Sequence, residues 1–231
     1  MLYRLCTNTE TSRLNIHLGL IEGTHTDIKL DQYEWLAEED DASSPPPDVT
    51  CYLLKQAADT NGLATDVRFF RAGGKKNPDP KKIPDFWSTV TLPTVTEAFK
   101  ELVEEIDPGI HQFFPINLII DKTSERVDHT RFYHFICGRF LDIPLHELPS
   151  NPGTHDARPL DDDERHRWRT VQERPDIQAY LEQLPIWRFR DHSRRICFIN
   201  KKCLDAAHER GLKGFKESSG QIGRASCRER V

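Results

Sequence analysis

Residues 85–121 read DFWSTVTLPTVTEAFKELVEEIDPGIHQFFPINLIID and carry the clearest structural signal in the chain. Thr94, followed three residues later by Glu97, is a capping-box pattern that predicts the start of a helix there. Apolar residues then recur at helical spacing as far as Pro108-Gly109, which predicts the end of the helix. This part of the chain therefore predicts one amphipathic helix with a glycine stop.

A strand is expected directly after that stop. The run Phe113–Ile120 is nearly continuous apolar and β-branched, which is typical of a strand covered on both faces. Pro115 cannot donate a ladder hydrogen bond, so it favours an edge or entry position for the beginning of this strand.

A similar plan recurs near the C-terminus. Ile196–Ile199 reads as a short apolar strand, Asn200 is a good helix N-cap, and Gly211 ends the helix that follows. The same five-residue pattern follows both helices: a glycine, a branched aliphatic residue, two spacers and a phenylalanine. It occupies Gly109–Phe113 after the first helix and Gly211–Phe215 after the second. The match indicates a weak internal repeat of strand, helix and strand.

The remaining elements give an α+β fold with a mixed or mainly antiparallel sheet and a few helices. We expect an N-terminal β-rich part over residues 1–80 and an α+β core over residues 81–219. Helices are predicted over residues 161–173 and 175–184. The other predicted strands are Leu2–Cys6, Leu14–Ile21, Asp27–Leu30, Cys51–Lys55, Val67–Ala72, Phe132–Ile136, Phe140–Ile143 and Ile186–Phe189.

Composition excludes several classes of protein. At 231 residues, 37 % hydrophobic and 30 % charged, the chain is expected to bury a core without disulfides or metals. Its N-terminus lacks a signal-peptide pattern and no apolar run reaches a membrane-spanning length, which predicts a cytoplasmic protein that binds no membrane. The six cysteines show no paired spacing, so we expect them to be reduced and mostly buried.

Residues 220–231 end in QIGRASCRERV, which looks like one reading frame of a sequencing-library adapter rather than native protein. Without its three arginines and one glutamate the chain has 29 basic and 36 acidic residues. This acidity argues against nucleic acid as a partner and favours a basic one.

Catalytic and metal-binding patterns are missing from the sequence. There is no GxSxG elbow, and RAGGKK (71–76) lacks the upstream glycine and the Ser or Thr of a phosphate loop. Cys137 and Cys197 lie in apolar strands and are expected to be small buried hydrophobes. We therefore predict no catalytic, cofactor or metal residues. Five histidines, at positions 129, 134, 146, 155 and 166, do not show the spacing of zinc-binding residues.

One loop has the composition of a partner-binding site. Trp35 stands close to the four carboxylates of Glu38, Glu39, Asp40 and Asp41, just before a proline-rich segment. A large aromatic anchor beside a charged rim is typical of protein interfaces. The other interpretation is that Trp35 fills the core and the acids are a solvated loop.

Over residues 85–216 the chain resembles family eleven of the bacterial polymorphic-toxin immunity proteins, formerly a domain of unknown function. The residues that carry the resemblance are Asp85-Phe86-Trp87, Thr94–Ile106, Phe113–Ile116, Ile186–Phe189 and Ile196–Ile199 with the following helix to Gly211–Phe215.

The resemblance implies a cytoplasmic immunity protein that binds and neutralises a cognate toxin domain by occlusion, with no catalytic residues to carry over. The acidic charge would suit a basic toxin. The alternative is a hydrolase or transferase whose carboxylates and histidines converge only in the folded chain.

Overall fold

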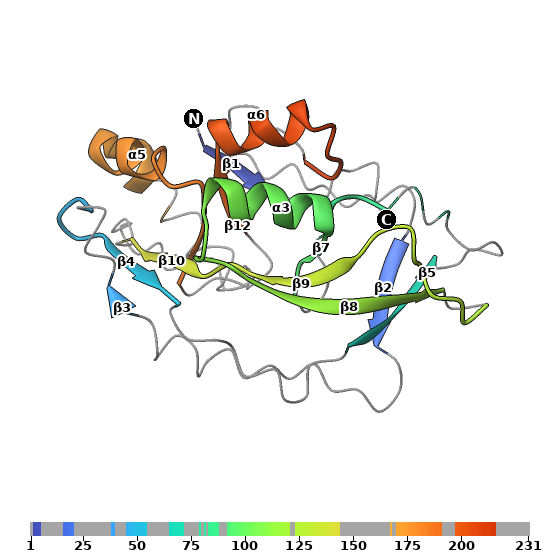
Figure 1. The fold of residues 1–231 in the computed structure, drawn as a ribbon. Coiled ribbons are helices and arrows are strands. Elements are labelled where there is room, and N and C mark those ends of the chain that lie inside the picture. Colours follow the sequence, from blue (N-terminus) through green and yellow to red (C-terminus); the bar gives the residue numbers. More distant parts are fainter. Residues whose placement is uncertain are drawn as a thin grey trace, which may run out of the picture.

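The computed structural model describes residues 2–5, 16–20, 38–39, 45–54, 65–71, 79, 81, 83–87, 92–120, 123–143, 167, 170–190 and 197–215. These residues form two six-stranded mixed sheets with helices packed against them (Figure 1). The α+β fold expected from the sequence is therefore confirmed. Among the described helices, none is both long enough and apolar enough to cross a bilayer.

The two sheets are called sheet I and sheet II, and each contains one parallel pair among its described strands: Arg139–Asp142 with Ile186–Phe189 in sheet I, and Asp66–Arg71 with Gln112–Ile120 in sheet II. Sheet I has the order β1 (Leu2–Leu5), β12 (Cys197–Asn200), β11 (Ile186–Phe189), β10 (Arg139–Asp142), β4 (Thr50–Leu53) and β3 (Glu38–Glu39). Sheet II has the order β2 (Ile16–Leu20), β5 (Asp66–Arg71), β8 (Gln112–Ile120), β9 (Phe132–Ile136), β7 (Thr94–Thr96) and β6 (Phe86–Trp87). Both sheets combine strands from residues 1–80 with later strands, so a boundary at residue 80 does not separate them.

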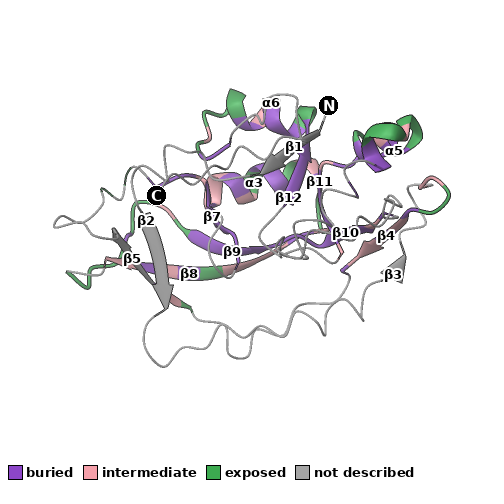
Figure 2. Cartoon of the chain, turned by 180° about the vertical axis from the view of Figure 1, so that it is seen from behind, coloured by how far each residue is buried: buried purple, intermediate pink, exposed green. Residues whose placement is uncertain are grey.

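Two helices lie side by side and cover both sheets. Helix α3 (Glu97–Ile106) contacts α6 (Lys201–Glu209), and Figure 2 shows buried residues along the inner sides of both. Their apolar faces share one core with residues of both sheets. That core contains Phe86, Val95, Phe99, Leu102, Val103, Tyr133, Phe135, Cys137, Ile186, Cys197, Ile199, Cys203, Leu204, Ala207 and Phe215.

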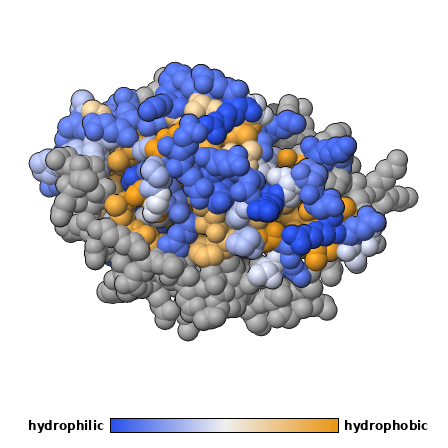
Figure 3. Space-filling model, viewed as in Figure 1, coloured by the Kyte–Doolittle hydropathy of each residue, from blue (hydrophilic) through white to orange (hydrophobic). Residues whose placement is uncertain are grey.

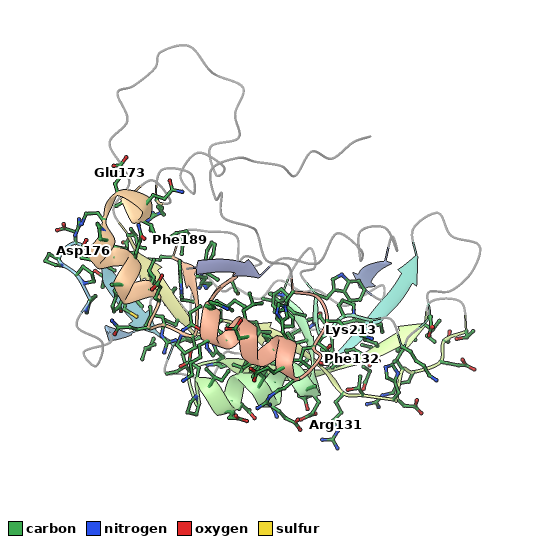
Figure 4. The ribbon with its side chains drawn as sticks, turned by 90° about the horizontal axis from the view of Figure 1, so that it is seen from above. Arg131, Phe132, Glu173, Asp176, Phe189 and Lys213 are labelled. Atoms are coloured by element: carbon green, nitrogen blue, oxygen red, sulfur yellow. The ribbon has the colours of Figure 1, made fainter. Side chains whose placement is uncertain are left out.

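The opposite face of sheet I is covered by helix α5 (Pro175–Leu181). Successive strand residues point to opposite faces, so Ile186 faces the α3 and α6 core while Trp187 faces α5. Phe189 joins Trp187 in the α5 core and lies beside that helix in Figure 4. Burial on both faces explains why β11 and β12 are apolar almost throughout.

The predicted start of α3 is wrong. Thr94 lies in strand β7, where it pairs with His134 of β9, and the helix begins at Glu97. Glu97 accepts a hydrogen bond from the Tyr133 hydroxyl, while the hydroxyl of Thr96 donates to Asp85 Oδ1 at 2.6 Å. Sheet pairing, a tertiary interaction, has overridden the local capping pattern.

The predicted helix ends and the second N-cap are confirmed. Gly109 and Gly211 have φ angles of 75° and 68°, in the left-handed region that glycine adopts without strain. The side chain of Asn200 accepts a hydrogen bond from the backbone N–H of Cys203 at 2.9 Å. Phe113 and Phe215, which end the two repeated patterns, pack on the same core. The β7–α3 and β12–α6 units thus share a helix exit, although residues 211–215 contain no strand.

Strand β8 differs in part from the prediction. It pairs with β9 over Gln112–Ile116 and with β5 only from Asn117 onward, so Pro115 lies where β5 is not yet paired, as expected. The prediction that both faces of this strand are covered is wrong in part, because Pro115 is exposed and only Ile116 and Leu118 of the strand are buried.

Candidate functional site

The chain passes from one sheet to the other at Cys137-Gly138, between the end of β9 and the start of β10. Gly138 lies so close to the segment after α3 that a Cβ atom placed on it would be 1.8 Å from the carbonyl oxygen of Ile110. Its own carbonyl accepts a hydrogen bond from the backbone N–H of Leu54 at 2.7 Å. Ionisable side chains gather around this crossing, and we call them the junction cluster: Asp107, His111, Cys137, Arg139, Arg188 and Cys197.

A buried ion pair forms the centre of the junction cluster. Arg139 donates through both terminal nitrogens to the two carboxylate oxygens of Asp107, with Nη2 to Oδ1 at 2.9 Å. It also donates from Nη1 to the carbonyl of Ile186 in β11 at 3.1 Å. The two side chains are only 7 % and 8 % exposed. The pair thus joins the end of α3 to the beginning of β10 through a bidentate, charge-assisted contact.

His111 connects the ion pair to the crossing peptide. Its Nε2 is 3.0 Å from Asp107 Oδ2, and its Nδ1 is 3.2 Å from the backbone nitrogen of Gly138, which can only donate. The hydrogen-bond pattern therefore assigns the neutral ring a proton on Nε2. Burial opposes charge on the ring, but the hydrogen bond with Asp107 raises the pKa of His111. Burial also opposes ionisation of Asp107, yet hydrogen bonds with His111 and Arg139 lower its pKa.

Two thiols complete the junction cluster. Burial raises the pKa of Cys137, but the thiol of Cys197, together with His111 and Arg188, holds that pKa well below its usual value. The pKa of Cys197 is raised well above its usual value by the hydrogen bond with Cys137 and by burial. Both cysteines are free and buried, as the sequence predicted. Cys51 and Cys203 are also buried and form no disulfide, whereas Cys6 and Cys227 lie outside the described residues.

A thiol, an imidazole and a carboxylate in this order have the chemistry of a nucleophile, its base and the group that orients the base. However, Cys137 is only 4 % exposed and the His111 side chain only 1 %. In this conformation a substrate at the protein surface cannot reach the Cys137 sulfur. The geometry supports a structural role, in which the cluster ties α3, β10, β11 and β12 together.

The outer face of α3 is acidic. Glu97, Glu101, Glu104 and Glu105 share this face by helical spacing, and the last three are exposed. Lys100 is the only basic residue in the helix. Its Nζ lies 3.5 Å from Glu97 Oε1 and 3.7 Å from Glu104 Oε2. Hydrophilic side chains dominate the centre of this side of the molecule in Figure 3. We call the four glutamates the acidic face.

The partner-binding residues predicted from the sequence are only partly within the described residues. Glu38 and Glu39 form β3 at the edge of sheet I, where they pair with Leu53 and Tyr52. Trp35, Asp40 and Asp41 lie outside the described residues, as does the tail from 220 to 231. The interface interpretation of this loop therefore stays a prediction.

The five histidines considered for metal binding do not form a cluster within the described residues. His129 is exposed on the β8–β9 turn and His134 is buried in β9, while the other three lie outside the described residues. No group of three or more His, Cys, Asp or Glu in the described part of the chain is placed to hold a metal ion.

Sequence reasoning missed the junction cluster. Asp107 and Arg139 are 32 residues apart, and their pairing depends on how two sheets meet. The available signal was Arg139 itself, a charge inside the otherwise apolar run from Phe135 to Leu141, because a buried charge requires a partner.

Compared with models of known protein families and with curated proteins, the chain matches none of them.

Proposed function

We propose that this chain is a bacterial immunity protein that acts in the cytoplasm, binds the toxin domain encoded beside it and neutralises that domain by occlusion. The support comes from where the motifs that resemble immunity family eleven lie in the fold. They are far apart in sequence, yet each contributes to the core shared by α3, α6 and both sheets. Phe86, Phe99, Phe113, Ile186 and Cys197 come from the five motif segments, one from each, and pack in or against this one core.

The charge distribution supports a basic partner. The acidic face places four carboxylates on one side of α3, and the whole chain carries a formal net charge of −5. A complementary potential speeds the first encounter of two proteins and adds specificity. The acidic face is therefore the described surface that best suits a basic toxin domain.

Co-expression tests the proposal directly. Cells that produce the toxin domain from the neighbouring reading frame are expected to grow when the full chain is produced with it, and the two proteins should co-purify. An interface of roughly 800 Å² per partner is enough for such a complex. If cells die although the chain is folded and abundant, and no complex forms, the proposal is wrong.

A second function, that of a hydrolase or transferase, draws on the Cys137, His111 and Asp107 arrangement. The same assay separates it from occlusion. Replacing Cys137 with serine removes the thiolate nucleophile with little change in shape. Under occlusion this variant still protects cells and co-purifies with the toxin domain; under an enzymatic mechanism it binds but no longer protects.

The acidic face gives a prediction about rates. Replacing Glu101 and Glu104 with glutamine should slow association with the toxin domain by roughly three- to tenfold at low salt, because it weakens electrostatic steering. The difference should vanish at high salt, where surface charges are screened. Stopped-flow or surface-binding kinetics measure both rates.

The matched control removes the same amount of charge elsewhere. Glu125 and Asp128 are exposed acids on the β8–β9 turn. Their replacement with glutamine and asparagine should leave the association rate nearly unchanged. Equal slowing in both double variants would show that net charge, rather than the acidic face, governs the encounter.

A further inference from the structure

Arg190 directly follows β11 and lies against Tyr52 of β4. Its guanidinium carbon is 4.8 Å from the centre of the Tyr52 ring, and its Nη1 donates to the Tyr52 hydroxyl at 3.1 Å. Its backbone N–H donates to the carbonyl oxygen of Leu141 in β10 at 3.0 Å. The side chain is nevertheless 32 % exposed. Arg190 therefore presents a guanidinium group that is held in a fixed position and is still open to solvent.

Buried side chains support Tyr52. It pairs directly with Phe140 of β10, and the two rings stack with 5.5 Å between their centres and 14° between their planes. The guanidinium carbon of Arg188 in β11 lies 4.8 Å from the centre of the Phe140 ring. Both Phe140 and Arg188 are buried. These contacts connect Arg190, through two stacked rings, to the interior of the protein.

One edge of the Arg190 guanidinium group is unused. Its contacts with the described residues all involve Nη1, so Nε and Nη2 donate to none of these residues. Asp142 Oδ2 is 3.8 Å from Nη1, which is too far for a hydrogen bond, and Asp142 Oδ1 accepts instead from Arg167 at 3.2 Å. The Nε and Nη2 hydrogens of an arginine point in the same direction and match the two oxygens of a carboxylate.

We propose that Arg190 is the anchor for a carboxylate of the bound partner, an aspartate or glutamate of the toxin domain that accepts hydrogen bonds from both Nε and Nη2. The inference rests on the proposed function and adds to it a contact that holds the complex together. Tyrosine and arginine are enriched among the few residues that carry most of the binding energy of an interface. Because stacking on Tyr52 already fixes the side chain, Arg190 loses little conformational entropy on binding.

Arg190 and the acidic face have different kinetic roles. Long-range attraction between the acidic face and a basic partner governs the rate of encounter, whereas a desolvated, hydrogen-bonded charge pair governs the rate of dissociation. A two-pronged contact also fixes the orientation of the partner. A basic protein without a carboxylate at the matching place is therefore attracted to this chain but is not retained.

The test compares Arg190→Lys and Arg190→Ala with the full-length wild type in surface-binding kinetics with the toxin domain. Lysine keeps the charge but lacks the planar fork, so the complex should dissociate roughly tenfold faster while its association rate changes less than about twofold. Alanine removes both, and dissociation should be about 10- to 100-fold faster. The Tm of each variant is measured alongside and should stay close to that of the wild type.

Two further variants are the controls. Arg126→Lys changes an exposed arginine on the β8–β9 turn and should alter neither rate. Tyr52→Phe keeps the ring but removes the hydroxyl that holds Nη1, and should speed dissociation by roughly two- to tenfold. A toxin-domain Asp or Glu whose replacement by its amide speeds dissociation from the wild type, but not from Arg190→Lys, identifies the acceptor.

The outcomes separate this inference from the function on which it rests. If the complex forms and Arg190→Lys dissociates at the wild-type rate, Arg190 is not the anchor, and the proposed function stands. The same conclusion follows if the substitution changes only the association rate. If the wild-type chain forms no complex with the toxin domain, both proposals are wrong. The lysine variant decides the matter even if the alanine variant does not fold.

Discussion

Replacing Gly138 with alanine is expected to lower the free energy of unfolding by about 3 kcal/mol or more, at or above the upper end of the usual cost of overpacking. The new Cβ would lie 1.8 Å from the carbonyl oxygen of Ile110 and 3.0 Å from its carbonyl carbon. Both are backbone atoms, so no side chain can rotate away. Denaturant unfolding measures the loss directly, and the Tm should fall by roughly 6–12 °C.

Gly109→Ala is the control for this prediction. Gly109 has a φ angle of 75°, but its added Cβ would meet no atom within 4 Å. The cost there is the left-handed backbone alone, about 1–2 kcal/mol. If the two variants lose similar amounts of stability, the close approach at the sheet crossing is less tight than the structure indicates.

The local signals in the sequence predicted the elements that depend on nearby residues. Gly109 and Gly211 ended their helices as expected, and the Asn200 cap was confirmed, because each of these features is settled within one helical turn. The prediction that the helix starts at Thr94 was wrong for the opposite reason. Its capping pattern competed with pairing to β9, and sheet formation depends on residues far away in sequence.

The contacts between the sheets could not be predicted from the sequence. Gly138 separates two predicted strands, and nothing near it in the sequence indicates that the strands on its two sides belong to different sheets. Arg139 showed that a counter-charge was needed without showing which of the chain's many carboxylates supplies it. Asp107 has that role because α3 ends beside the crossing.

Replacing Asp107 with asparagine should lower the free energy of unfolding by about 3–5 kcal/mol, since it leaves the buried guanidinium of Arg139 without its counter-charge. His111 also loses the carboxylate that accepts its Nε2 proton. Denaturant unfolding at neutral pH measures the effect. Replacing Arg139 with methionine in the same chain should recover part of the loss, because it removes the orphaned charge.

Glu105→Gln separates this effect from a general loss of charge. Glu105 pairs with Arg210 at the surface, and its side chain is 67 % exposed, so its loss should cost less than about 1 kcal/mol. The pH provides a second criterion. The folded-state pKa of Asp107 lies below the ordinary value of 3.8, so the pair contributes stability above that pH and loses it as the pH falls through the folded-state pKa. The difference in free energy of unfolding between wild type and Asp107→Asn should therefore become smaller below about pH 3.8. A gap that stays constant into acid would mean that shape, rather than charge, makes Asp107 necessary.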